Sequence, residues 1–252
     1  MKSVLAACVP GLIEARADLL LPLASVGKLL LLAQIARDLA DGGLFATDEW
    51  TIDPEDYCAG SGLLCRLSPR RWTVLDLIHL TAAVSDNTAT NVLIRQVGLE
   101  RVNEGAKALG LTRTRILDRI RAPRLLCHPP TFALGTAREP AALAQRIAGE
   151  EAWARTMLGW LALNTDRAMV AAAIPHDPEA LEVPERPVGP DRLWVANKTG
   201  TDAGIRADVG VVRGARDLCY AVVGSCPPGR EYELLRAMRA VGLLVGRAAA
   251  AG

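Results

Sequence analysis

The sequence is poor in the residues that build metal sites and nucleic-acid surfaces. It has only three histidines, and its six cysteines form no C-x-x-C pair. Structural metal ligands normally come in closely spaced groups, so we expect no bound metal and no cofactor. Lys plus Arg number 29 against 28 Asp plus Glu, which leaves a net charge of +1. Phosphate contacts need an excess of positive charge, so nucleic acid is not an expected partner.

Long uninterrupted apolar runs are also absent. The most hydrophobic stretch, residues 19–36, is broken by Pro22 and Lys28, whereas a membrane span needs ~18 apolar residues in a row. Pro10 and the charges at residues 14–18 interrupt any secretory signal. We therefore expect a cytoplasmic protein that binds no membrane, is a monomer or weak oligomer, and acts on a small molecule. A chain from which a leader had been removed would look the same.

Lysine is scarce, and this makes the position of each lysine informative. The chain has four, Lys2, Lys28, Lys107 and Lys198, so 25 of its 29 basic residues are arginines. Three short motifs follow one another along the chain: Ser25-Val26-Gly27-Lys28, Ser85-Asp86-Asn87 and Lys198-Thr199-Gly200. Two of the four lysines, Lys28 and Lys198, lie in the first and the third of these motifs. Composition makes all three together roughly a one-in-10⁵ coincidence, so chance does not explain the set.

The hydrophobic pattern predicts strands at both ends of the chain and helices between them. The expected strands are residues 3–9, 14–22, 192–200, 206–214 and 217–226. The expected helices are residues 25–43, 72–85, 87–97, 100–110, 138–149, 151–164 and 230–246. Residues 118–135 and the proline-rich 175–191 are expected to be irregular, and the alanine-rich C-terminus is expected to fray.

This order predicts an α+β fold, with one antiparallel sheet built from both chain ends and a helical insertion. We expect a single two-lobed domain over residues 1–252. Its sheet lobe would comprise about residues 1–24 and 189–252, and its helical lobe about residues 25–188. The cleft should lie where the two lobes meet.

The spacing of Ser25 and Lys28 suits nucleophilic catalysis. A serine hydroxyl attacks a carbonyl only when a base takes its proton, and residues three apart share one face of a helix. Lys28 can be that base if burial and a second cation, Lys198, lower its pKa. Ser85 could relay the proton to a leaving nitrogen. The alternative interpretation makes Ser25 only a helix cap and Lys28 a solvated surface residue.

The other motif residues suit substrate binding. Asn87 offers an amide to a substrate carbonyl and to Lys28, while Asp86 is expected to point inward as an anchor. Thr199 can donate to a substrate carboxylate, and Gly200 would let a substrate lie against the backbone. The backbone N–H groups of Ser25 and Thr201 would form an oxyanion hole. Alternatively, the second motif is a capping turn and the third a strand end.

Together the three motifs resemble those of class A β-lactamases and penicillin-binding proteins. The likeness extends through residues 85–111 and to Gly60-Ser61-Gly62, and covers roughly residues 20–226. It implies a five-stranded antiparallel sheet flanked by helices beside an all-helical lobe, with the nucleophile at the head of a central helix. It also implies an acyl-enzyme on Ser25. Arg206 is similar in placement to an arginine that binds the substrate carboxylate, although a surface salt bridge explains it equally well.

The resemblance breaks down at one residue. Class A enzymes carry a glutamate shortly after a Leu-Asp-Arg sequence, and it activates the deacylating water. Here that stretch is Leu117-Asp118-Arg119-Ile120-Arg121, so Arg121 stands in the glutamate's place. Arginine stays protonated and cannot be a general base. Efficient β-lactam turnover by the class A route is therefore in doubt.

Three functions remain open. The first is a serine hydrolase that forms an acyl-enzyme on a β-lactam or a related amide or ester. The second keeps the mechanism and changes the substrate, as in a carboxypeptidase, an esterase or a biosynthetic acyltransferase. The third is a penicillin-binding module without turnover, which would require the Ser25 and Lys28 geometry to be broken.

Overall fold

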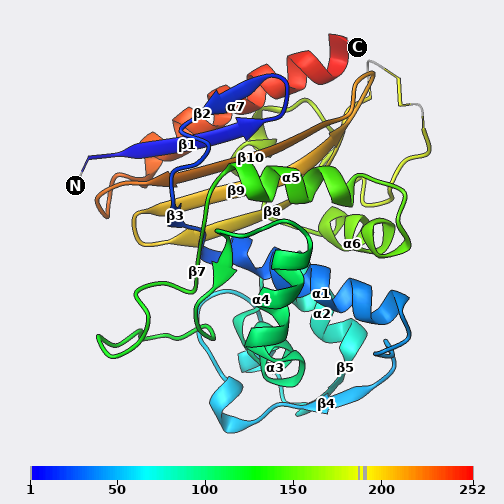
Figure 1. Ribbon diagram of the computed structural model, residues 1–252, viewed down its shortest axis with the longest axis vertical. Coiled ribbons are helices and arrows are strands. Elements are labelled where there is room, and N and C mark those ends of the chain that lie inside the picture. The colour runs from blue at the N-terminus through cyan, green and yellow to red at the C-terminus, as the bar shows by residue number, and fades with distance from the viewer. Residues whose placement is uncertain (1, 187, 190–191, 252) are drawn as a thin grey trace.

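A computed structural model describes residues 2–186, 188–189 and 192–251 and confirms the α+β fold (Figure 1). Five antiparallel strands form the main sheet in the order β2-β1-β10-β9-β8. Their bounds are Val4–Val9 for β1, Ile13–Ala15 for β2, Trp194–Asp202 for β8, Ile205–Arg213 for β9 and Leu218–Ser225 for β10. The sheet is therefore built from both chain ends, as predicted, and β8 is one of its edges.

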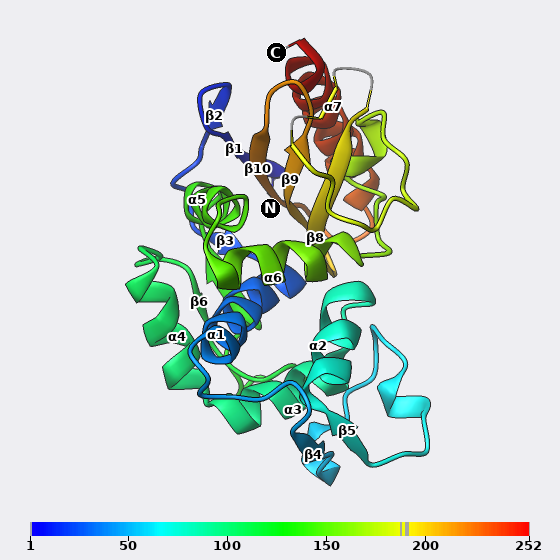
Figure 2. The ribbon, with the colours of Figure 1, turned by 90° about the vertical axis from the view of Figure 1, so that its right-hand side faces the viewer.

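Helices cover both faces of this sheet. Side chains alternate along β1, where Ala6 and Cys8 pack in one hydrophobic core and Ala7 and Val9 in the other. Helix α7 (Glu231–Ala251) covers one face (Figures 1 and 2). Helices α5 (Arg138–Ile147) and α6 (Ala152–Ala162) lie on the opposite side of the sheet. The second face thus meets helices from the middle of the chain.

Helix α1 (Lys28–Ala40) is the centre of the helical part. It is buried on nearly every side from Lys28 to Ala36, as expected of a helix that is apolar all round. Around it pack α2 (Val74–Ala83), α3 (Asn87–Val97), α4 (Leu99–Ala108) and α6. A 3₁₀ turn, η1 (Ala24–Gly27), precedes α1 and touches β8 and β9. Residue 28 therefore lies where the sheet meets the helices.

Short elements complete the chain. Strands β3 (Leu21–Pro22), β7 (Ala133–Gly135) and β6 (Arg115–Ile116) form one small sheet, and β4 (Glu49–Thr51) and β5 (Arg71–Thr73) form another. Further 3₁₀ turns are η2 (Pro54–Asp56), η3 (Leu64–Arg66) and η4 (Ala171–Ala173). All six cysteines are free. Among the described residues, no helix is both long and apolar enough to cross a membrane.

Three expectations about the elements were wrong. The strand predicted at 14–22 is two short strands in different sheets, because Arg16 adopts a positive φ of 49° and a turn follows it. The helix predicted from Ser25 starts as the 3₁₀ turn η1. The alanine-rich end does not fray but continues α7, because Ala249 is buried and its carbonyl accepts the Arg216 N–H at 3.0 Å.

Two glycines in helices give a test of this packing. A Cβ on Gly242 of α7 would strike the Val170 carbonyl, so Gly242→Ala should lower the free energy of unfolding by about 1–3 kcal/mol. Gly159 of α6 has no atom within 4 Å of such a Cβ, so Gly159→Ala should be neutral or stabilising by up to about 1 kcal/mol. Urea denaturation measures both. A Gly242→Ala protein as stable as the wild type would contradict this packing of α7.

Candidate active site

A cavity of about 150 Å³ opens where β8, η1 and the turn between α2 and α3 come together. Four residues singled out in the sequence line it: Ser25, Ser85, Thr199 and Thr201. The other lining residues are Ser61, Ala83, Val84, Asn164, Thr165 and Asp166. Segments that are far apart in the sequence therefore converge on one small space, and all three motifs reach it.

Backbone strain positions Ser25. The residue before it, Ala24, has a positive φ of 44°, which is unfavourable for any side chain except in special turns. Such strain persists only where the surroundings enforce it. Here the Leu23 N–H donates to the Ala133 carbonyl at 3.0 Å, and Gly27 leaves no room for a Cβ against Ala133. Strand β7 thereby holds the turn that presents Ser25 to the cavity.

Gly200 lets the edge strand β8 approach this turn. A Cβ on Gly200 would lie 3.0 Å from the Ser25 nitrogen and 2.9 Å from the Val26 nitrogen, and would strike the Leu23 carbonyl. The space that a side chain would take at Gly200 is thus filled by the chain's own backbone. Only glycine permits this approach, which brings Thr201, the next residue, to the same cavity as Ser25.

The geometry suits an oxyanion hole. Ser25 is in the first turn of η1, where backbone N–H groups have no acceptor within the helix. Thr201 is on β8, an edge strand, and such a strand leaves backbone groups unpaired along its outer side. Both residues line the cavity. The oxyanion hole expected from the N–H groups of Ser25 and Thr201 stays a prediction, with both residues at one cavity.

Lys28 is fully buried and hydrogen bonded, so the interpretation of it as a solvated surface residue was wrong. Its Nζ donates to the Ser85 carbonyl at 2.5 Å, to Ser85 Oγ at 3.1 Å and to Asn87 Oδ1 at 3.0 Å. Three acceptors match the three hydrogens of an ammonium. All three bonds go to the second motif, and none of the hydrogen bonds among the described residues joins Lys28 Nζ to the Ser25 hydroxyl.

The electrostatics of the site favour proton release from lysine. Burial, and next the nearby Lys198 ammonium, hold the pKa of Lys28 well below its usual range. Burial lowers the pKa of Lys198 to about 8, against the opposing effect of Asp166 and Asp208. Both lysines are fully buried. A lysine poised in this way can act as a base near neutral pH, which an arginine cannot do.

The turn of the second motif is anchored by Asp86, as expected. Its Oδ2 accepts the backbone N–H groups of Leu63 and Leu64, both at 2.7 Å, and its Oδ1 accepts that of Ala89 at 2.9 Å. Asp86 thus caps α3 and ties loop 59–64 to it. Ser85 has a positive φ of 56°, which points its carbonyl and hydroxyl at Lys28.

Two predicted binding residues are engaged elsewhere. Asn87 accepts from Lys28 and donates Nδ2 to the Ala59 carbonyl at 3.0 Å, so it lies behind the cavity wall. The Arg206 guanidinium donates to the carbonyls of Asp202 at 2.9 Å and Ile205 at 2.7 Å. Neither Asn87 nor Arg206 lines the cavity around Ser25.

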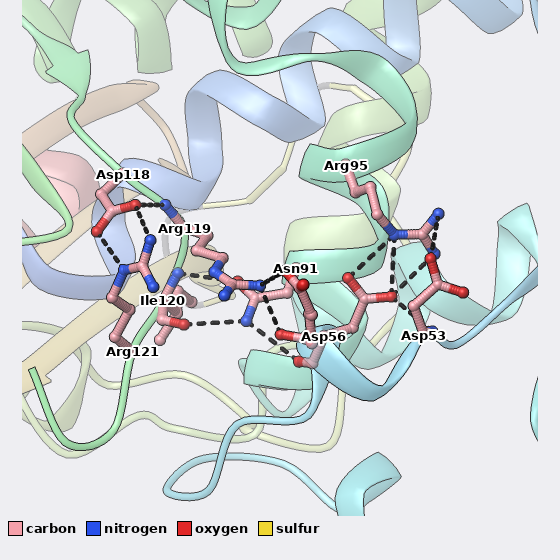
Figure 3. Close-up of polar contacts among 9 residues, drawn as sticks. Asp53, Asp56, Asn91, Arg95, Asp118, Arg119, Ile120 and Arg121 are labelled. Atoms are coloured by element: carbon pink, nitrogen blue, oxygen red, sulfur yellow. Dashed lines mark hydrogen bonds and ion pairs between the residues drawn. The ribbon is translucent and has the colours of Figure 1, made fainter.

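Arg121 does not line the cavity that Ser25 lines. Its Nε donates to Asp118 Oδ2 at 2.6 Å (Figure 3). Arg121 lines a second cavity instead. Asn91 holds this loop to α3, since its amide donates to the Ile120 carbonyl at 3.0 Å and accepts the Ile120 N–H at 2.8 Å. Asn91 was missed in the sequence, although it lies one helical turn after Asn87.

The residues after α6 were also missed. Asn164, Thr165 and Asp166 line the cavity, and Asp166 Oδ2 accepts the Thr199 hydroxyl at 2.8 Å. The only sequence signal was a polar Asn-Thr-Asp run directly after an apolar helix. Within the described residues, no group of three His, Cys, Asp or Glu side chains is placed to hold a metal ion.

The burial of Lys198 has a consequence for stability. Lys198→Met should raise the free energy of unfolding at pH 7 by about 1–3 kcal/mol, because the native protein no longer buries an ammonium. The gain should shrink as the pH rises from about 8 towards 10.5, the usual lysine value. In that window the unfolded wild-type chain binds more protons than the folded one, so wild-type stability rises with pH.

Urea denaturation at several pH values measures this effect. Lys107→Met, at an exposed position on α4, is the matched control and should give no such pH-dependent difference. A Lys198→Met protein that is less stable at pH 7, or whose gain does not vary with pH, would contradict the burial argument.

Comparisons with known proteins agree with the geometry. The β-lactamase from Sphaerobacter thermophilus DSM 20745 superposes with a TM-score of 0.82 at 24% identity, over 97% of this chain and 91% of that one. PBP-A gives 0.80 at 19% identity, over 98% and 89% of the two chains. A class A β-lactamase from Mycobacterium abscessus gives 0.78 at 21%, over 98% and 93%.

A search of curated protein sequences finds no significant match. The model of the beta-lactamase enzyme family, however, matches residues 11–248, nearly the whole chain. Together with the fold, this match places the chain in the β-lactamase and penicillin-binding-protein superfamily. The protein belongs to the beta-lactamase enzyme family.

Proposed function

We propose that this protein is a serine hydrolase that forms an acyl-enzyme on Ser25 with a β-lactam or a related amide or ester. One observation carries the proposal. Ser25, Ser85 and Thr201 line one cavity, and the Ser85 hydroxyl accepts a hydrogen bond from a buried Lys28 whose pKa is lowered by burial and by Lys198. This grouping supports roles for Ser25 as nucleophile, Lys28 as base and Ser85 as proton relay.

Acylation would begin when Ser25 Oγ attacks the substrate carbonyl. The neutral form of Lys28 takes the hydroxyl proton, and the N–H groups of Ser25 and Thr201 receive the developing oxyanion. The carbon–nitrogen or carbon–oxygen bond then breaks. The proton passes from Lys28 through the Ser85 hydroxyl, 3.1 Å away, to the leaving atom. The products of this step are an ester on Ser25 and a protonated leaving group.

Deacylation should be slow. Asp166 is the single carboxylate among the residues that line the cavity, and it already accepts the Thr199 hydroxyl. Arg121, at the place of the family's glutamate, pairs with Asp118 instead. Without a free carboxylate, water lacks a strong general base for its attack on the ester.

Acyl transfer to an amine is a second candidate, favoured by this same lack of a free carboxylate. A neutral amine attacks an ester without prior deprotonation, whereas water requires a base. A cytoplasmic acyltransferase, esterase or carboxypeptidase acting on a small molecule would use the same Ser25, Lys28 and Ser85.

Covalent trapping tests the acyl-enzyme. A fluorescent penicillin or neutral activated esters should add one acyl group to Ser25, seen by intact mass and peptide mapping. Ser25→Ala should abolish the label, and Lys28→Met should slow labelling by about 10²–10⁴-fold, the usual contribution of a general base. Ser61→Ala removes another cavity hydroxyl and should keep the label. Absence of any Ser25 adduct across the panel would refute the proposal.

The adduct should persist once formed. Its hydrolysis should be roughly 10²–10⁴-fold slower than in an enzyme whose deacylating water has a carboxylate base. Intact mass followed over time after removal of free probe measures the loss. Added hydroxylamine, an amine nucleophile, should accelerate release. Steady turnover of a chromogenic cephalosporin at about 10 s⁻¹, a typical enzymatic rate, would contradict slow deacylation.

A further inference from the structure

The charge of the cavity differs from what a carboxylate-bearing substrate requires. Asp166 is the single ionisable side chain among the lining residues. The ammonium groups of Lys28 and Lys198 are fully buried behind the wall. The Lys198 ammonium donates to the Thr199 carbonyl at 2.9 Å. A ligand beside Thr199 therefore meets a carboxylate first.

Asp166 is held firmly in this position. Its carbonyl accepts Asn164 Nδ2 at 2.8 Å and Asn197 Nδ2 at 3.3 Å. Its Oδ1 accepts the Ala168 N–H at 3.1 Å, and its Oδ2 accepts the Thr199 hydroxyl at 2.8 Å. Both ends of the residue are thus fixed by neighbours. A charge fixed in this way discriminates between ligands without first having to be ordered.

Thr199 cannot serve a substrate carboxylate in this arrangement. A hydroxyl has one hydrogen to donate, and that of Thr199 goes to Asp166. Only its oxygen lone pairs remain for a ligand, and these attract hydrogen-bond donors. The pair formed by Asp166 and Thr199 therefore presents acceptors alone on this side of the cavity.

No lining residue compensates for this polarity. Arg206, the one arginine considered for a carboxylate, is bonded to the carbonyls of Asp202 and Ile205 at the β8–β9 turn. Arg167, next to Asp166, donates to the carbonyls of Val195 and Ala162. Neither guanidinium belongs to the cavity lining.

We propose that the Asp166–Thr199 wall is a subsite for a cationic group, so that the substrate is an ester or amide that carries an ammonium there. The inference rests on the acyl-enzyme function proposed above and names its substrate class. An ammonium would form charge-assisted hydrogen bonds with Asp166 and Thr199. A carboxylate at the same place would face a fixed like charge and no cationic side chain, and such contacts exclude the wrong partner.

Matched activated esters test this subsite. Three probes share one acyl group and one leaving group and differ only in a side group, which is an ammonium, a neutral methyl or a carboxylate. The second-order rate of Ser25 acylation is measured by intact mass. We expect the wild type to react about tenfold or more faster with the ammonium probe than with the carboxylate probe.

Variants assign the preference to Asp166. Asp166→Asn keeps the size and an acceptor oxygen but removes the charge, and should bring the two rates within about threefold of each other. Asp166→Glu keeps the charge and should retain the preference. Asp202→Asn removes an exposed carboxylate on β8, the strand that carries Thr199, and is the matched control, so its ratio should equal that of the wild type. The acylation rate with the neutral methyl probe shows whether each variant still acylates Ser25.

Equal wild-type rates for the two charged probes, or an unchanged preference in Asp166→Asn, would overturn the inference. If the acyl-enzyme proposal is wrong, intact mass will show no Ser25 adduct with any of the three probes. In that case, calorimetric titration of Ser25→Ala with stable amides of the same three side groups still decides the charge preference. Tighter binding of the ammonium amide supports the subsite, and equal affinities refute it.

Discussion

Two buried lysines in one place are the constraint on which the site depends. Burying an ammonium is unfavourable, and placing a second beside it adds repulsion. Lys28 is tolerated because Ser85 and Asn87 supply acceptors for all its hydrogens. Lys198 is tolerated because Asp166 and Asp208 are near. The same burial that opposes stability lowers the pKa of both lysines, so the catalytic potential and the stability penalty have one cause.

The elements around Lys28 are shaped by its need for acceptors. Ser85 adopts a positive φ, and Asp86 holds the turn by accepting three backbone N–H groups. Asn87 then links Lys28 to the Ala59 carbonyl. Removing the anchor at Asp86 would free the turn as well as the loop before it. This part of the helical lobe thus holds the two Ser85 oxygens and the Asn87 amide oxygen against the Lys28 ammonium.

The sequence predicted the residue types of the site better than it predicted the backbone elements around them. The three motifs named Ser25, Lys28, Ser85 and Lys198 because each motif restricts residue type and spacing at once. The fold class and four of the five strands of the main sheet followed from the hydrophobic period, whereas the strand predicted at 14–22 was wrong. The short strands β3, β6 and β7 did not, because two- or three-residue pairings leave no periodic signal. The alanine-rich end was misjudged because its helix is decided by burial of Ala249 against the sheet, a tertiary effect.

The residues that support the site and line the rest of the cavity could not have been predicted in the same way. Asn91, which holds the loop at Ile120, lies inside a helix whose pattern says only that one face is buried. Asn164 and Asp166 follow α6 in an irregular segment, and their neighbours Asn197 and Thr199 are more than thirty positions away. These contacts between the segment after α6 and strand β8 depend on how β8 packs against α6. A local sequence pattern does not predict which distant segments pack together.

Asp166 affects both the buried Lys198 and the charge that the cavity presents to a ligand. Its charge opposes the burial effect that lowers the pKa of Lys198, and so helps that lysine keep its proton. Asp208, the other nearby carboxylate, is fully buried, and burial raises its pKa to about 6. Of the two carboxylates that favour the charged form of Lys198, Asp166 is the one that lines the cavity. A substrate ammonium at Asp166 would compete with Lys198 for the same negative charge and lower the lysine pKa further.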